Sequence, residues 1–161
     1  MELLAPAGNI ENFVAAIEAG ADAVYVGAPG MNARALTKDV SFEEISAMID
    51  YCRKRDVKFY LAANSLVLEH ELSHVIKSLA LYESLQPDAL IVQDTGIVRL
   101  VRSFFPSLTL HGSTLMAAHN VMSVEMQAKM GCERAVLARE LTLDEIRYIS
   151  DNSSIELEVF V

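Results

Sequence analysis

Residues 19–27 read Ala-Gly-Ala-Asp-Ala-Val-Tyr-Val-Gly, and two later stretches of the chain repeat this pattern. They are Leu-Gln-Pro-Asp-Ala-Leu-Ile-Val-Gln-Asp at 85–94 and Met-Gly-Cys-Glu-Arg-Ala-Val-Leu-Ala-Arg at 130–139. In each stretch a helix ends at Gly or Pro, an acidic residue follows in the turn, and a continuous apolar strand begins. Continuous apolar strands are typical of parallel sheets whose faces are covered. The repeated junction therefore predicts an α/β fold with a parallel sheet.

Seven short runs rich in β-branched or aromatic residues are spaced along the chain, and we expect each to be a strand. They cover residues 2–5, 23–27, 58–63, 89–93, 109–111, 134–138 and 155–161. The first six are each followed by a polar turn and a segment with helical periodicity. A step of about 25 residues per unit fits a TIM-barrel-like (β/α) repeat of about 250 residues, whereas the Rossmann and P-loop glycine motifs are absent. We predict an incomplete barrel of six βα units and a seventh strand, with residues 1–161 as one barrel segment.

The composition of the chain narrows the class of protein. Among 161 residues, 52% are hydrophobic, so a packed core is expected rather than disorder. The longest uncharged apolar stretch, residues 59–68, is shorter than the roughly 20 residues that a membrane span needs. The first residues lack the basic start of a secretory signal, so we expect a cytoplasmic protein that does not use a membrane. A net charge of −9 argues against non-specific nucleic-acid binding by the whole surface.

Polar side chains follow five successive predicted strands, at the edge where barrel enzymes collect their active sites. They are Asn32, Arg34, Asn64, Gln93, Asp94, His111, Ser113, His119, Asn120, Arg139 and Glu140. Taken singly, Asp94, Ser113 and Asn120 are also good helix caps. Taken together, polar residues after five strands predict a binding site at this edge.

The residue types suggest roles at that site. The guanidinium groups of Arg34 and Arg139 are suited to hold a carboxylate or phosphate. His111 titrates near neutrality and is the candidate acid or base, with Asp94 or Glu140 orienting it; the alternative is a structural histidine bonded to backbone. The candidate substrate-binding residues are Arg34, Asn64, Gln93, Ser113, Asn120 and Arg139.

Residues 70–74 read His-Glu-Leu-Ser-His, which matches the zincin motif. On a helical wheel His70 and His74 lie together, nearly opposite the apolar side of the predicted helix. We therefore expect a solvated face and no metal site, with zinc binding as the alternative. Cys52 and Cys132 lack metal-ligand spacing, and we expect both to be buried thiols.

Several motifs, in order along the whole chain, resemble the peptidase U32 family. They are Glu-Leu-Leu-Ala-Pro-Ala-Gly-Asn (2–9), Gly-Ala-Asp-Ala-Val-Tyr-Val-Gly (20–27), Asn-Ala-Arg (32–34), Asp-Ala-Leu-Ile-Val-Gln-Asp (88–94), Phe-Pro-x-Leu-x-x-His-x-Ser-Thr (105–114), His-Asn (119–120) and Val-Leu-Ala-Arg-Glu-Leu-Thr-Leu-x-Glu-Ile (136–146). The family is named for collagenase-like protease activity. The resemblance also implies relatives that hydroxylate RNA bases, with prephenate in some cases, or that hydroxylate quinones without oxygen; several hold an iron–sulfur cluster.

Two differences from the family affect these implications. A segment like His-Gly-Ala-x-Cys normally follows the seventh strand in the family, and this chain ends before it. The resemblance thus implies no cofactor on this segment and an iron–sulfur cluster in the full-length protein. The family commonly has Ser-Thr-Gln-Met where this chain has Ser113-Thr114-Leu115-Met116, so an amide that would face the site is replaced at Leu115.

We therefore expect the N-terminal barrel segment of a U32 enzyme whose full-length form hydroxylates RNA bases or a related aromatic substrate. The alternatives are a peptidase, as the family name states, and a fragment that binds or assembles without turnover. The expected partners are a small anionic ligand or RNA in the full-length protein. An incomplete barrel leaves unpaired strand edges, so we also expect a homo-oligomer.

Overall fold

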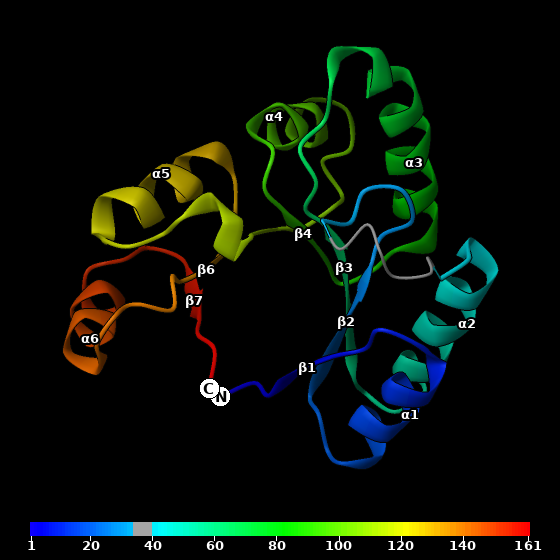
Figure 1. Ribbon diagram of the computed structural model, residues 1–161, viewed down its shortest axis with the longest axis horizontal. Coiled ribbons are helices and arrows are strands. Elements are labelled where there is room, and N and C mark those ends of the chain that lie inside the picture. Colours follow the sequence, from blue (N-terminus) through cyan, green and yellow to red (C-terminus); the bar gives the residue numbers. More distant parts are fainter. Residues whose placement is uncertain (34–39) are drawn as a thin grey trace.

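The computed structural model describes residues 1–33 and 40–161, which form one curled sheet of seven parallel strands in the order β1 to β7 (Figure 1). The strands are β1 (Leu4–Pro6), β2 (Ala23–Gly27), β3 (Lys58–Ala63), β4 (Ala89–Val92), β5 (Leu110–Gly112), β6 (Arg134–Val136) and β7 (Glu156–Glu158). The helices between them are α1 (Ile10–Glu18), α2 (Phe42–Arg53), α3 (Leu72–Leu85), α4 (Thr95–Phe104), α5 (Val121–Met130) and α6 (Leu143–Asp151), with short 3₁₀ turns η1 (Glu69–Glu71) and η2 (Thr114–Met116). Each predicted strand is present and neighbours its successor, so the predicted barrel-like repeat is confirmed.

Polar residues at strand–helix junctions set where the helices begin. Ser41 caps α2 and Thr142 caps α6, and in both cases a glutamate three residues later completes a capping box. Asn9 caps α1 in the same way with its side-chain oxygen. These caps pair backbone amides at the starts of the helices that would otherwise lack partners.

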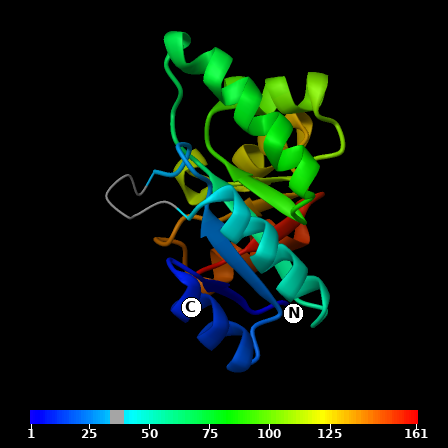
Figure 2. The same ribbon diagram turned by 90° about the vertical axis from the view of Figure 1, so that its right-hand side faces the viewer.

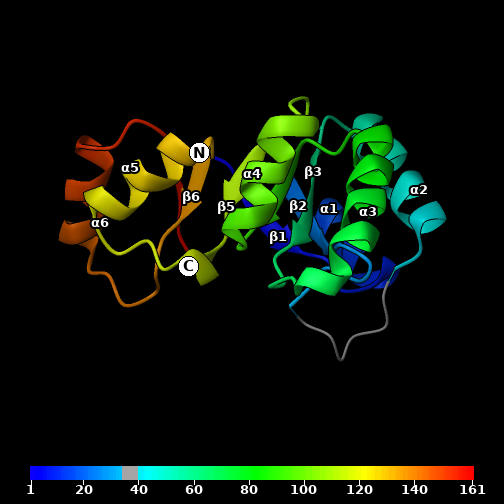
Figure 3. The same cartoon turned by 90° about the horizontal axis from the view of Figure 1, so that it is seen from above.

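The outer face of the sheet is covered by helices, which form two separate apolar layers. Helices α1 to α4 pack on one part of the sheet around fully buried side chains such as Phe59, Leu61 and Leu90. Helices α5 and α6 form a smaller layer around Val124 and Ile149. The separation of the two helix groups is visible from above (Figure 3). Burial of each such aliphatic or aromatic side chain contributes about 2 kcal/mol, so these layers supply most of the stability of the fold.

The inner face of the sheet lines the lumen of a half-barrel. Alternate strand residues such as Tyr60, Ala62 and Ile91 point inward and form their own cluster. The sheet curls far enough that Glu2, beside the first strand, forms an ion pair with Arg134 on β6 at 2.7 Å. Figure 2 shows the same curl from the side. The lumen therefore has polar and charged walls, unlike the helix-covered face.

Strands β1 and β7 lie at the two ends of the strand order. Each edge would suit pairing with another strand, and the expected homo-oligomer stays a prediction. In the described part of the chain, no helix is long and apolar enough to cross a membrane.

Candidate functional site

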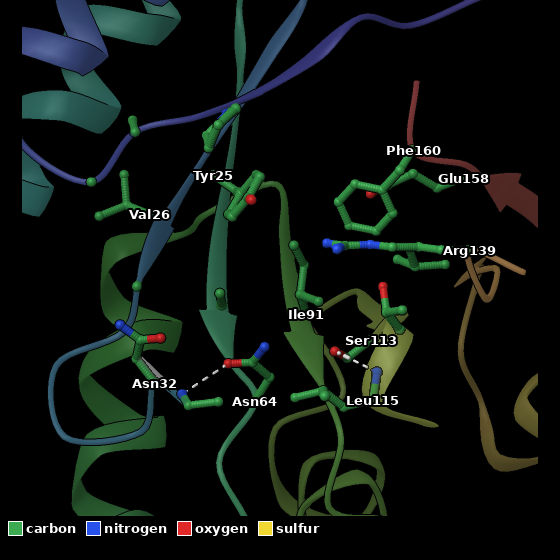
Figure 4. A pocket seen from close by; sticks show the side chains of 18 of the residues that line it. Tyr25, Val26, Asn32, Asn64, Ile91, Ser113, Leu115, Arg139, Glu158 and Phe160 are labelled. Carbon is green, nitrogen blue, oxygen red and sulfur yellow. Dashed lines mark hydrogen bonds between the residues drawn. The ribbon is translucent and has the colours of Figure 1, made fainter. Parts of the chain in front are cut away.

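A cavity of about 510 Å³ opens at the carboxyl ends of the strands, where the predicted polar residues gather (Figure 4). Its wall comes from all seven strands, β1 to β7, or from the segments that directly follow them. Ala62, Ile91 and Val136 form an apolar inner surface, and Asn32, Asn64 and Ser113 add polar groups. Such a mixture of apolar wall and few polar groups is typical of a small-molecule site.

Arg139 is the cation among the described residues that line this cavity. Figure 4 shows its guanidinium group reaching from the end of β6 into the cavity beneath the ring of Phe160. The guanidinium carbon lies 4.2 Å from the centroid of that ring, a contact that positions the group without using its N–H donors. Within residues 1–33 and 40–161, no ion pair joins Arg139 to a carboxylate. Arg34, the other predicted anion-binding arginine, lies outside the described residues.

Other predicted residues shape the same wall. The side-chain oxygen of Asn64 accepts a hydrogen bond from the Ala33 amide at 3.2 Å, which ties the segment after β2 to the segment after β3. The Ser113 hydroxyl accepts from the Leu115 amide at 3.2 Å and begins the turn η2. Leu115 itself is half exposed and lines the cavity. The Gln-to-Leu difference from the family pattern therefore lies on the cavity wall, as expected from the sequence.

Asp94, Asn120 and Gln93, like the His111 ring described below, lie outside the cavity lining. Asp94 caps α4, where its carboxylate accepts from the Gly96 and Ile97 amides at 2.7 and 3.1 Å, and it also accepts from the Val67 amide. Asn120 caps α5 through a capping box with Ser123. Asp94 and Asn120 thus make the contacts of helix caps, which is the alternative that their sequence positions also allowed. Gln93 follows β4 and is half-buried. A substrate-binding role for Gln93 and Asn120 stays a prediction that this cavity does not support.

The predicted proton-transfer group of His111 with Asp94 or Glu140 stays a prediction, and no hydrogen bond joins His111 to either carboxylate among the described residues. His111 is buried in the lumen and packs edge-on against the Tyr60 ring, with centroids 4.9 Å apart. Burial, together with the charge of Arg134, lowers the pKa of His111 to about 4, so its ring is neutral at pH 7. Asp94 is engaged in capping, and the exposed Glu140 lies 3.7 Å from His119 instead. His111 lies on β5 and faces the lumen beside Tyr60, and Glu140 lines the cavity.

Sequence reasoning missed an ionic network inside the lumen, toward the amino ends of the strands. Arg134 binds Glu2 at 2.7 Å and Glu156 at 2.7 and 3.0 Å. Glu2 also accepts from Lys58 at 2.8 Å and from the Tyr60 hydroxyl at 2.9 Å. The hydrogen bonds from Arg134, Lys58 and Tyr60 outweigh burial and lower the pKa of Glu2 to about 2. In the sequence, the network is indicated only by the charged residues Lys58 and Arg134, which begin β3 and β6. Their common contact with Glu2 depends on the curl of the sheet.

The zincin-like motif does not lie on one helix. His70 is in the 3₁₀ turn η1 and His74 is in α3, which begins at Leu72, so the two rings do not have the spacing of a single α-helix. Both histidines are exposed. The described residues hold no group of three or more potential metal ligands. Cys52 and Cys132 are buried, as expected, and burial raises the pKa of each thiol to about 11.

The parallel half-barrel and the cavity at its carboxyl edge define a TIM-barrel-like protein with a ligand site in the usual place for that class. The sequence pattern of Peptidase family U32 matches residues 8–161, so the chain belongs to the peptidase U32 family. A solved U32 peptidase, Mk0906, has a similar fold with a TM-score of 0.81 at 16% identity, over 99% of this chain and 68% of the other.

Named relatives of this chain fall into two groups. It is 38% identical to tRNA hydroxylation protein P of Haemophilus influenzae, over 99% of this chain and 35% of the relative. It is 34% identical to the 23S rRNA 5-hydroxycytidine C2501 synthase of Escherichia coli, over 100% of this chain and 24% of the relative. It is 36% identical to an uncharacterized protease of Methanocaldococcus jannaschii, over 100% of this chain and 40% of the relative. The chain thus spans about a quarter to two fifths of the length of these relatives.

Proposed function

We propose that this chain is the barrel portion of an enzyme that hydroxylates RNA bases, and that its cavity holds a small anionic ligand on Arg139. The observation that carries the proposal is an arginine aimed into a cavity at the carboxyl edge of the barrel, without a carboxylate partner in the described part of the chain. The likeness to a tRNA hydroxylation protein and to an rRNA hydroxycytidine synthase supports the reaction class.

The cavity suits a small organic acid better than a bare anion. The planar guanidinium of Arg139 binds a carboxylate through two parallel hydrogen bonds. Ile91 and Leu115 offer apolar surface on the same wall, and Asn64 offers an amide for a hydroxyl or carbonyl group. Prephenate, which the family resemblance implies for some relatives, combines a carboxylate with a ring and fits this chemistry.

The RNA and any redox cofactor would be held elsewhere in a longer protein that acts in the cytoplasm. The net charge of −9 is unfavourable for a phosphate backbone, so we place the RNA-binding surface outside this segment. An iron–sulfur cluster needs accessible thiolates, whereas Cys52 and Cys132 are buried with raised pKa values. These two cysteines do not fit a cluster.

The direct test is nucleoside analysis in the source organism. Cells lacking the gene, cells with the natural gene and cells with Arg139→Ala are compared for hydroxylated nucleosides in tRNA and rRNA by mass spectrometry. We expect the hydroxylated nucleoside to disappear in the deletion strain and in Arg139→Ala at matched protein level. Arg147→Ala, which removes an exposed charge paired with Asp144 on α6, is expected to keep the modification.

Two outcomes would contradict the proposal. Unchanged hydroxylated nucleosides in the deletion strain would show that the protein does not modify RNA. Cleavage of peptides by the purified protein that is lost in Arg139→Ala would favour the peptidase alternative. The structure gives that alternative no added support, because no hydrogen bond joins a serine hydroxyl to a histidine ring across the described ranges.

A further inference from the structure

The lumen contains more carboxyl groups than cations that can neutralise them. Glu2, Glu156 and Glu158 all lie within 3.5 Å of Arg134, and Lys58 is the second cation of the network. Three carboxyl groups thus share two positive charges, and Arg134, Glu2 and Glu158 are the members shielded from water. One carboxyl group is left without full compensation.

The hydrogen bonds of Arg134 show which carboxyl group is left. Its Nη1 binds Glu2 at 2.7 Å, while Nε and Nη2 bind Glu156 at 3.0 and 2.7 Å. Glu158 lies 3.5 Å from Nη1, at the limit of a hydrogen bond and on an atom already used by Glu2. Glu158 is therefore the weakly compensated member of the three.

Glu158 is also the carboxyl group of this network that lines the cavity. Glu156 and Glu158 are two residues apart on β7, so both point into the lumen, with Glu158 nearer the carboxyl edge. The side chain of Glu156 is 70% exposed, whereas that of Glu158 is 18% exposed. Figure 4 shows Glu158 on the same wall as Arg139 and Phe160.

The pKa values of the two glutamates of β7 are shifted in opposite directions. Burial raises the pKa of Glu158 despite the nearby Arg134, whereas hydrogen bonds from Arg134 lower the pKa of Glu156. The titratable and charged groups around Glu158, taken from all neighbouring elements, are Glu2, Tyr25, Lys58, Tyr60, His111, Arg134, Arg139, Glu140 and Glu156. A bound anion adds a further negative charge, which favours the neutral form of Glu158.

We propose that Glu158 is a ligand-binding residue that takes up a proton when an anion binds at Arg139 and donates its carboxyl O–H to that anion. This inference rests on the proposed function, because it requires an anionic ligand in the cavity. The proton comes from solvent and bonds to a carboxyl oxygen of Glu158, and no bond of the ligand is broken. The cavity thereby selects ligands whose anionic group accepts hydrogen bonds from both the Arg139 guanidinium and the neutral Glu158 carboxyl group.

Calorimetry in buffers of different ionisation enthalpy tests the proposal. Prephenate is titrated into the full 161-residue chain at neutral pH in imidazole, bis-Tris and Tris, and the slope of the binding enthalpy against the buffer ionisation enthalpy gives the protons taken up. We expect uptake of a substantial fraction of one proton by the natural chain and none by Glu158→Gln. The glutamine amide can still donate a hydrogen bond, so Glu158→Gln is expected to bind at neutral pH within about threefold of the natural affinity.

The control variant and the outcomes separate the two proposals. Asp144→Asn, an exposed carboxylate on α6, is expected to leave both affinity and proton uptake unchanged. Binding that depends on Arg139 but takes up no proton, or uptake that persists in Glu158→Gln, would overturn the role of Glu158 and leave the anion site standing. Absence of binding would overturn both. The slope for the natural chain tests the proposal by itself, even if Glu158→Gln folds poorly.

Discussion

The two ends of the barrel lumen both carry charged residues, but their charges are compensated in different ways. Toward the amino ends of the strands, Arg134 makes close hydrogen bonds with Glu2 and Glu156, and its side chain is 8% exposed. Toward the carboxyl ends, Arg139 stacks on Phe160 without a carboxylate partner among the described residues, and Glu158 has one long contact.

This difference separates groups that hold the sheet together from groups that are available to a ligand. A buried charge that is paired and hydrogen-bonded ties distant strands together and resists rearrangement. A charge directed into a cavity with few protein partners keeps its interaction capacity for a bound molecule. Barrel proteins commonly divide stability and function between the two ends of the strands in this way.

Removal of Arg134 should have the largest effect on stability, because it removes the ion pairs at the amino ends of the strands. Arg134→Met leaves Glu2 without its guanidinium partner inside the lumen, and we expect a loss of about 4 kcal/mol in the free energy of unfolding. Urea denaturation measures this loss. Arg147→Met, at an exposed pair, should change the free energy of unfolding by less than about 0.5 kcal/mol. A similar small change for both variants would show that the network does not stabilise the fold.

The neutral His111 should make stability depend on pH. Its pKa is lowered from 6.5 to about 4 in the folded chain, so the unfolded chain binds a proton first as the pH falls. The contribution of neutral His111 is therefore complete above pH 6.5 and is lost between pH 6.5 and about 4, by about 3 kcal/mol. Urea denaturation of the natural chain and of His111→Gln across this range measures the difference.

If the free energy of unfolding changed with pH in the same way in the natural chain and in His111→Gln, this role of neutral His111 would be contradicted. Glu2, whose pKa falls from 4.5 to about 2, contributes stability above pH 4.5 that is lost as the pH drops toward 2. That loss is common to both proteins and therefore cancels in the difference.

Removal of Arg139 should leave the fold intact and lower the affinity for the ligand. Arg139 is exposed and its cation–π contact with Phe160 contributes about 0.5 kcal/mol. Loss of a charged bidentate contact should lower the affinity for prephenate at least tenfold, which is about 1.4 kcal/mol. Calorimetry measures the affinity, and Arg139→Lys should recover part of it. Equal affinities for the natural chain and Arg139→Ala would move the anion site elsewhere.

The smallest expected effect is at Leu115, on the cavity wall. Leu115→Gln restores the amide common in the family and adds one hydrogen-bonding group beside the ligand. Since the side chain is 53% exposed, stability should not change, and we expect the affinity for prephenate to rise about threefold. The same titration measures it, and weaker binding would show that the apolar surface of Leu115 contributes more than the amide.

The fold was largely predictable because its signals are local. Apolar runs bounded by Gly, Pro and acidic residues predicted all seven strands. The capping boxes of Ser41 and Thr142 at the starts of α2 and α6 are equally local features of the sequence. These signals depend on backbone hydrogen bonding and on burial within a few residues of sequence.

The candidate site was predictable only in part, because side-chain direction on short strands depends on the curl of the sheet. Arg139, Asn64 and Ser113 reach the cavity as expected. His111 points deeper into the lumen, and Asp94 is used by the first amides of α4. Glu158 was not among the predicted site residues, because its place on the cavity wall depends on which face of the short strand β7 turns inward.

A crystal structure of the chain with bound prephenate tests the contrast between the two ends most directly. We expect the ligand carboxylate about 3 Å from the Arg139 guanidinium, with a Glu158 oxygen within hydrogen-bond distance of the same anion. Prephenate bound instead at the depression lined by Lys58 and Arg53, at the amino ends of the strands, with the cavity at Arg139 empty, would contradict it.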